Sequence, residues 1–144
     1  MIYSIEVRVT ARVADTEIAD RVADAVTNVF PAIELERRPG ALVGTTHSLD
    51  RLSELLHRRA ILDTARNEFH SNLHGNTFEF SLKKQAAFEG VVTFAVGEPG
   101  ELGEIDVVVT VEEPDVETFI DYVAPPTEDG TPIEDDFERS WQSN

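Results

Sequence analysis

The chain has 144 residues, 28 acidic and 12 basic side chains and no cysteine, which gives a formal net charge of -16. The lack of cysteine excludes disulfides, thiol catalysis and thiolate metal sites, and it fits a cytoplasmic location. With 41% hydrophobic residues the chain is expected to fold around one core, and no apolar run is long enough to span a bilayer, so we expect no membrane partner.

The N-terminal part is predicted to form a strand followed by a helix. Residues 3–13 alternate between apolar and polar side chains, the pattern of a half-buried strand. Asp15 or Thr16 offers an N-cap for the helix, and Pro31 stops the helix soon after Val29. The chain is therefore expected to open with a β-α unit.

A hairpin and a long helix are predicted next. Residues 33–37 and 41–46 are expected to form the two strands of the hairpin. Ser48 is expected to cap a helix that runs to about Phe69. The apolar positions of this helix move from one face to another partway along. We therefore expect a kink or break near residues 57–59, or a helix that is buried on two sides.

Three more strands and a short helix are predicted in the second half of the chain. Residues 77–83, 91–96 and 105–111 have the composition and alternation of strands. Pro114 suits the first turn of a helix whose apolar positions share one stripe.

This element order predicts an α+β fold, a two-layer sandwich in which a mostly antiparallel sheet carries its helices on one face. The other face is free for solvent, RNA or a second copy of the chain. Residues 1–124 are expected to form a single domain, and residues 125–144 an acidic tail that is partly ordered at best. Phe137 and Trp141 are the tail's apolar exceptions and are candidates to dock onto the domain.

Lysine is scarce, since the chain has ten arginines but only two lysines. An acidic, lysine-poor surface keeps a protein soluble in concentrated salt, where the screening length falls to about 3 Å near 1 M. We therefore expect a halophilic protein of a salt-adapted cytoplasm. The alternative is an acidic protein of an ordinary cytoplasm.

The basic residues are concentrated between residues 37 and 84, which hold eight bases and five acids, whereas residues 114–144 hold one base and nine acids. We expect part of this basic segment to form an RNA-binding surface. The predicted contact residues are Arg51, Arg58, Arg59, Asp63, Arg66, Lys83, Lys84 and Gln85.

Asp63 is expected to organise this surface. On a continuous helix, spacings of 4, 3 and 4 put four side chains on one face: Arg59, Asp63, Arg66 and His70. Asp63 would hold the two guanidinium groups ready to grip phosphates with paired hydrogen bonds. The alternative, which the spacing alone favours, is a solvated ladder of ion pairs on a surface helix.

Lys83, Lys84 and Gln85 come at a predicted strand end, where their donors suit a phosphate or a base edge. The alternative is a charged strand end that prevents edge pairing. Four phenylalanines are candidates for stacking on unpaired bases, although packing in the core is the more common role: Phe78, Phe80, Phe88 and Phe94. Phe88 is the best of these candidates, because it is expected in the loop after the lysines.

No sequence pattern points to catalysis. His70 and His74 form an H-x-x-x-H pair, but no third residue has the spacing of a further metal ligand. No glycine pattern matches a phosphate loop, and no Ser, His and Asp residues are linked into a triad. We therefore expect no catalytic residue, no metal and no cofactor.

Four segments resemble an archaeal uncharacterised protein family, family 0201: RRAILDTARNEF at 58–69, FSLKKQAAFEGVVTF at 80–94, GELGEIDVVVTV at 100–111 and FIDYVAPPTEDGTPIE at 119–134. The resemblance covers nearly all of residues 1–134. It implies a fold similar to that of the large-subunit ribosomal protein that holds 5S ribosomal RNA, and an RNA-binding domain.

These observations predict a non-catalytic protein whose partner is structured RNA. The alternative is a homodimeric protein-interaction or regulatory module, because a helix with two apolar faces has more apolar surface than one small sheet covers. A small-molecule enzyme ranks behind both, since no linked catalytic groups are found.

Overall fold

The structure is a computed structural model that describes residues 3–95, 103–128 and 131–132. The helices are α1 (Ala19–Val29), α2 (Asp50–Arg58), α3 (Leu62–Ser71), α4 (Lys84–Phe88) and α5 (Val116–Val123). The strands are β1 (Ser4–Arg12), β2 (Glu34–Arg38), β3 (Ala41–Thr46), β4 (Leu73–His74), β5 (Thr77–Lys83), β6 (Glu104–Glu113), β7 (Thr127–Glu128) and β8 (Thr131–Pro132).

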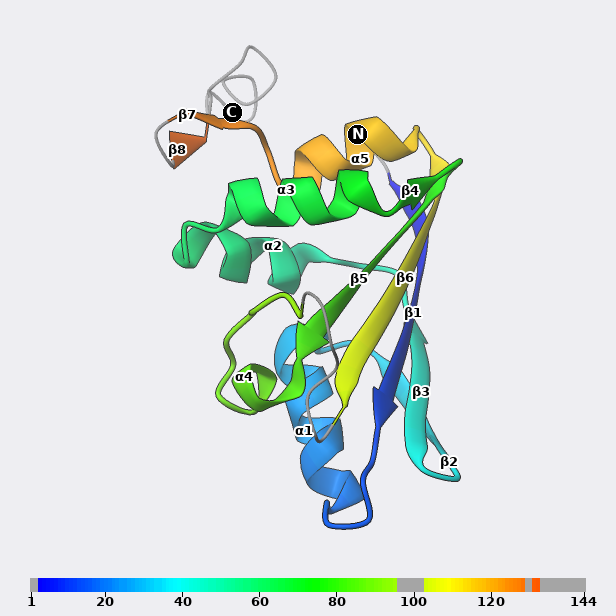
Figure 1. Cartoon of the computed structure of the whole chain (residues 1–144). Helices are drawn as coiled ribbons and strands as arrows, with labels where there is room; N and C mark the ends of the chain where they lie inside the picture. The colour runs from blue at the N-terminus through cyan, green and yellow to red at the C-terminus, as the bar shows by residue number, and fades with distance from the viewer. Residues whose placement is uncertain (1–2, 96–102, 129–130, 133–144) are drawn as a thin grey trace.

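Strands β1 to β6 form one six-stranded antiparallel sheet in the order β2-β3-β1-β6-β5-β4, while β7 and β8 pair with each other. The helices gather along one side of this sheet (Figure 1). The predicted α+β fold, with an antiparallel sheet that carries its helices on one face, is confirmed. The opposite side, called the open face below, is covered by no helix of the described residues.

The core lies between the sheet and the helices, and the central strands β1 and β6 supply its floor. Their inward side chains are all at most 6% exposed: Ile5, Val7, Val9 and Ala11 on β1, and Ile105, Val107, Val109 and Val111 on β6. Each buried Val or Ile side chain contributes roughly 1.5–3 kcal/mol relative to leaving it exposed. The strict alternation confirms the strands predicted at residues 3–13 and 105–111.

The predicted hairpin is confirmed as β2 and β3, which pair from Glu34 with Thr45 to Arg38 with Ala41. Gly40 in the turn has φ 73, a left-handed conformation that favours glycine. Gly44 is required for a different reason, because a Cβ atom there would lie 2.4 Å from the carbonyl oxygen of Glu34. Glycine therefore allows β2 and β3 to approach this closely.

Helix α1 starts later than predicted. Its N-cap is Ile18, without a side-chain cap, so the prediction of Asp15 or Thr16 as the cap is wrong. The chain instead makes a turn before the helix, in which Glu17 Oε1 accepts a hydrogen bond from the Ala14 N–H at 2.8 Å. The Glu17 carboxylate lies inside this turn because it also pairs with a buried lysine, Lys84.

The break predicted near residues 57–59 is confirmed. Helix α2 ends at Arg58 and α3 begins at Leu62, with Ala60 between them at a φ of 54. Each helix buries an apolar face of its own: Leu52, Leu55 and Leu56 on α2, and Leu62, Ala65 and Phe69 on α3. The two apolar faces are therefore covered within the chain. Ser48 accepts the Asp50 N–H at 3.2 Å, although the N-cap position itself is Leu49.

The strand predicted at residues 91–96 is wrong within the described residues. Phe94 makes one isolated bridge with Leu82, and residues 91–93 belong to no strand. The chain instead turns into the short helix α4 directly after β5, so Phe88 lies at the end of a helix and not in a loop. The short strand β4, which pairs with β5, was not predicted.

Helix α5 confirms the predicted apolar stripe, since four side chains are buried: Val116, Phe119, Ile120 and Val123. The N-cap is Asp115, so Pro114 precedes the helix and does not lie in its first turn as predicted. The Asp115 carboxylate accepts the Thr118 hydroxyl at 2.6 Å and the Thr118 N–H at 3.1 Å. These hydrogen bonds, with the hydroxyl contributing most, lower the pKa of Asp115 below its ordinary value.

Beyond α5, strands β7 and β8 lie in the segment predicted as an acidic tail. Phe137 and Trp141, the predicted docking residues, are outside the described residues.

Tyr122 ties α5 to the start of α2. Its hydroxyl donates to Asp50 Oδ1 at 3.0 Å, and its ring stacks on Tyr3 with 4.6 Å between centroids. Burial, followed by the hydrogen bond and charge of Asp50, raises the pKa of Tyr122 from 10.0 to about 12. Since the folded state favours the neutral phenol, its stabilisation is complete below pH 10 and is lost as the pH rises through 12.

We expect Tyr122 in the folded protein to ionise with a midpoint of about 12, measured from tyrosinate absorbance. Asp50→Asn should lower that midpoint, because it removes the negative charge that opposes ionisation. The chain has only two tyrosines, so Tyr122→Phe assigns the signal. An ordinary midpoint for Tyr122 in the folded wild type would contradict this packing.

Candidate functional site

Lys84 is buried and is not part of an exposed basic surface. It is 1% exposed, and its Nζ donates to Glu17 Oε1 at 2.8 Å and to the carbonyl oxygen of Arg12. The Glu17 side chain is 8% exposed, so the ion pair is enclosed. The prediction that Lys84 contacts RNA is therefore corrected: its ammonium group holds the end of β1 and the loop before α1 against α4.

Asp63 does not organise Arg59 and Arg66. Arg66 pairs with Asp121 at 2.5 Å and donates to the Ala124 carbonyl at 3.1 Å. Asp63 accepts the hydroxyl of Thr127. The predicted shared face is absent because the helix breaks between Arg58 and Leu62, which separates Arg59 from α3. Arg66 and Asp63 therefore fasten the chain beyond α5 to α3.

Arg51 is also engaged with an acid. It pairs with Glu54 at 2.9 Å, three residues further along α2, and its side chain is 36% exposed. An exposed pair of this kind contributes about 0.3–0.5 kcal/mol and leaves the arginine able to exchange its partner. Arg51 thus remains a surface cation, but a neutralised one.

Lys83 and Gln85 are both exposed but lie apart from the helix face. Lys83 alternates with the buried Leu82 and extends from the open face of the sheet, on the side away from α2 and α3. Gln85 is on α4. The predicted contact residues therefore do not converge on one surface.

Four of the predicted contacts are exposed and have no side-chain ion pair or hydrogen bond to another described residue: Arg58, Arg59, Lys83 and Gln85. Arg58 and Arg59, called the helix-tip pair below, are the two arginines among them and are adjacent. They occupy the turn between α2 and α3, at the end of the helical layer far from the sheet (Figure 1). Backbone hydrogen bonds of 3.1–3.2 Å close this turn, from the amides of Arg59, Ala60 and Ile61 to the carbonyls of Leu55, His57 and Leu56. A fixed turn with two adjacent guanidinium groups suits an anionic ligand such as a phosphate.

Three of the candidate stacking residues are core residues. Phe78, Phe80 and Phe94 are at most 7% exposed and surround Phe69, with ring centroids 4.8, 5.0 and 6.0 Å from it. Phe88 is 37% exposed, and the Asn28 side chain holds the neighbouring Ala87 carbonyl at 2.9 Å. Phe88 is therefore the candidate that keeps a ring surface accessible.

The described residues contain no group of three or more His, Cys, Asp or Glu side chains that could hold a metal ion. His70 is on α3 and His74 is on β4, so the predicted H-x-x-x-H pair does not lie on one helix. No helix in the described ranges is both long and apolar enough to cross a membrane.

The buried pair of Lys84 and Glu17 is the site feature that sequence reasoning missed. A signal for it was present, because Lys84 and Ala87 are three residues apart and share one helical face. Both are buried, at 1% and 0% exposure. If α4 had been predicted as a helix, the spacing would have placed Lys84 on its buried face.

Comparison with known proteins shows relatives along most of the chain. A family described as RNA binding matches residues 6–112. A UPF0201 protein of Thermococcus onnurineus is 38% identical over 90% of this chain and 98% of its own length. A UPF0200/UPF0201 protein of Archaeoglobus fulgidus is 35% identical over 92% of this chain, which spans 41% of that longer protein.

Solved structures share the fold. The crystal structure of a UPF0201 protein from Methanococcus jannaschii has a TM-score of 0.81 and 34% identity, and the match covers 90% of this chain and 99% of that one. A second crystal structure, of an uncharacterized UPF0201 protein, has a TM-score of 0.79 and 34% identity over 89% of this chain. With relatives this similar over nearly their full length, the chain belongs to the archaeal UPF0201 family.

Proposed function

We propose that the protein binds structured RNA without catalysing a reaction, and that the helix-tip pair Arg58 and Arg59 contacts the phosphates. The match to a family described as RNA binding supports the ligand, and it spans both arginines. The exposure of the pair, without an acid partner among the described residues, supports the location. Arg51, in the first turn of α2, is a further candidate contact, and Phe88 on α4 is the candidate for base stacking.

Arginine is suited to this role in a strongly acidic protein. The chain's charge of -16 repels a polyanion at long range, so attraction must come from short contacts. A guanidinium group holds a phosphate by two parallel hydrogen bonds, which depend less on unscreened charge than a single ammonium contact does. We also propose that the protein functions in a salt-adapted cytoplasm. In this proposal residues 1–124 form the binding domain, and residues 125–144 form an acidic tail.

We expect the double substitution Arg58→Ala and Arg59→Ala to weaken binding of a labelled RNA hairpin about tenfold at low potassium chloride. It should also reduce the slope of log affinity against log salt by about 1 to 2. The reason is that each phosphate contact releases counterions on binding, and the variant makes fewer such contacts. Fluorescence anisotropy at several salt concentrations measures both quantities.

The matched control is Arg8→Ala with Arg38→Ala, which removes the same charge elsewhere. Both arginines are exposed and already paired with acids, Arg8 with Glu6 at 3.5 Å and Arg38 with Glu36 at 3.1 Å. The control should bind nearly as the wild type does. Equal losses in the two double variants would mean that net charge, and not the helix-tip pair, determines binding.

A homodimeric interaction module is the second candidate, and the open face favours it. The open face carries some uncharged side chains in register, Thr10 opposite Val43 and Thr77 opposite Thr110, beside charged ones such as Glu6, Arg8 and Asp106. The original reason for expecting a dimer no longer holds, because both apolar faces of α2 and α3 are buried within the chain. Light scattering distinguishes a 16.0 kDa monomer from a particle of twice that mass.

A further inference from the structure

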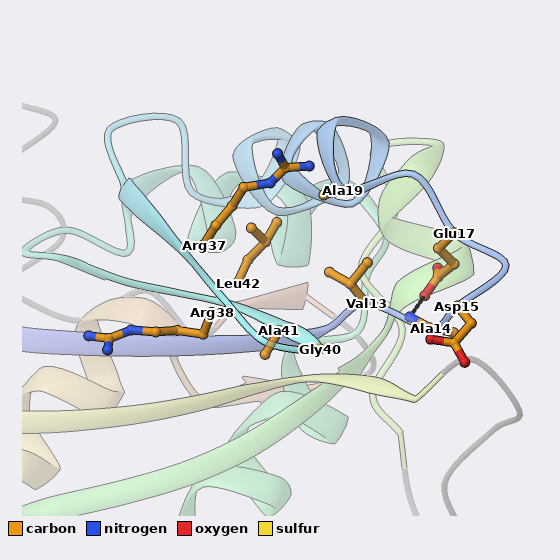
Figure 2. Close-up of a pocket in the computed structure, with 10 residues that line it drawn as sticks. All are labelled: Val13, Ala14, Asp15, Glu17, Ala19, Arg37, Arg38, Gly40, Ala41 and Leu42. Atoms are coloured by element: carbon orange, nitrogen blue, oxygen red, sulfur yellow. Dashed lines mark hydrogen bonds between the residues drawn. The ribbon is translucent and has the colours of Figure 1, made fainter.

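A cleft of about 370 Å³ lies between the loop that precedes α1 and the turn that joins β2 to β3 (Figure 2). Small or aliphatic residues such as Val13, Gly40 and Leu42 form its walls. Charged residues stand at its two ends: Asp15 and Glu17 on one side, and Arg37 on the other (Figure 2). The cleft lies outside the turn that carries the helix-tip pair.

Glu17, one of the residues that line this cleft, has an unsatisfied acceptor. Its Oε1 is fully used, because it accepts Lys84 Nζ at 2.8 Å and the Ala14 N–H at 2.8 Å. Its Oε2 is buried and has no hydrogen-bond partner among the described residues. A buried polar atom without a partner is costly, so a donor supplied by a ligand would be stabilising.

The two charged ends of the cleft are complementary. Asp15 adds a second carboxylate beside Glu17, and no described residue forms an ion pair with it. The guanidinium group of Arg37 lies near Ala19, across the cleft from both acids (Figure 2). Arg37 is exposed and likewise has no ion pair in the described ranges, whereas the neighbouring Arg38 points away from the other labelled residues (Figure 2).

We propose that this cleft binds a small zwitterionic molecule, with a protonated amine at Asp15 and Glu17 and a carboxylate or phosphate at Arg37. The amine supplies the N–H donor that Glu17 Oε2 lacks, and its charge is balanced by Asp15, since Lys84 already balances Glu17. The volume is at the lower end of the range of about 300–1,000 Å³ for small-molecule sites, which selects a compact ligand. This inference does not depend on RNA binding.

The test is a titration of the ¹⁵N-labelled full chain with two probes, γ-aminobutyrate for a carboxylate ligand and O-phosphoethanolamine for a phosphate ligand. We expect at least one probe to give saturable shifts of the amides of Ala14, Glu17 and Gly40. The probe that binds more tightly identifies the anionic group. The trimethylated analogues, γ-butyrobetaine and phosphocholine, keep the charge but have no N–H donor. They should bind about tenfold more weakly, since the buried acceptor stays unsatisfied.

Two exposed substitutions complete the experiment without disturbing the buried pair. Arg37→Ala should abolish the saturable shifts, whereas Arg38→Ala, with the same loss of charge, should retain them. The proposal is overturned if neither amine probe gives saturable shifts, if the trimethylated analogues bind equally well, or if the two arginine variants behave alike.

Discussion

Replacing Lys84 by alanine is expected to lower the free energy of unfolding by about 3–5 kcal/mol. The substitution leaves the carboxylate of Glu17 enclosed without its cation, and an unpaired buried charge is far more costly than the pair is favourable. It also removes the hydrogen bond to the Arg12 carbonyl, which joins α4 to the end of β1. Urea unfolding followed by circular dichroism measures the loss.

Lys83→Ala is the matched control, because the same side chain is removed one residue away at an exposed position. It should change stability by no more than about 0.5 kcal/mol. The double variant Lys84→Met with Glu17→Leu should recover much of the loss, since it replaces both charges by apolar groups of similar volume. If Lys84→Ala and Lys83→Ala are equally stable, Lys84 is not buried in a charge pair.

Phe69→Ala is expected to cost about 3–5 kcal/mol. Its ring is 0% exposed and packs against Phe78, Phe80 and Phe94, which link α3 to β5 and to the chain after α4. The remaining rings cannot fill the space, so the cost includes that of a cavity.

The control for this cluster is Phe88→Ala, the same substitution at a ring that is 37% exposed. It should cost well under half as much, and guanidinium or urea unfolding of both variants gives the comparison. Similar losses for Phe69→Ala and Phe88→Ala would show that the aromatic cluster is not the core of this half of the fold.

Most of the fold was predictable because its elements have clear periods. The alternation over residues 3–13 and 105–111 identified the two central strands, and the shift of the apolar face identified the break between α2 and α3. The prediction failed at residues 84–95, where a helix of only five residues precedes an isolated bridge. Short apolar runs of this kind do not distinguish helix from strand by period.

The candidate site was less predictable, because nearness in sequence is not nearness in space. Lys83 and Lys84 are adjacent, yet Lys83 is exposed on the open face, whereas Lys84 is buried at the start of α4. Arg66 finds its partner in Asp121, 55 residues away, which no local spacing reveals. Arg59 remained available because α2 ends at Arg58, which takes Arg59 out of register with Asp63, its predicted partner on α3.

The most direct test of the proposed function is an amide chemical-shift titration of the ¹⁵N-labelled protein with an RNA hairpin in potassium chloride. The account predicts saturable shifts centred on residues 58–61, which Arg58→Ala with Arg59→Ala removes while the rest of the spectrum stays folded. Absence of any saturable shift, or shifts confined to open-face residues such as Arg8 and Thr10, would contradict it.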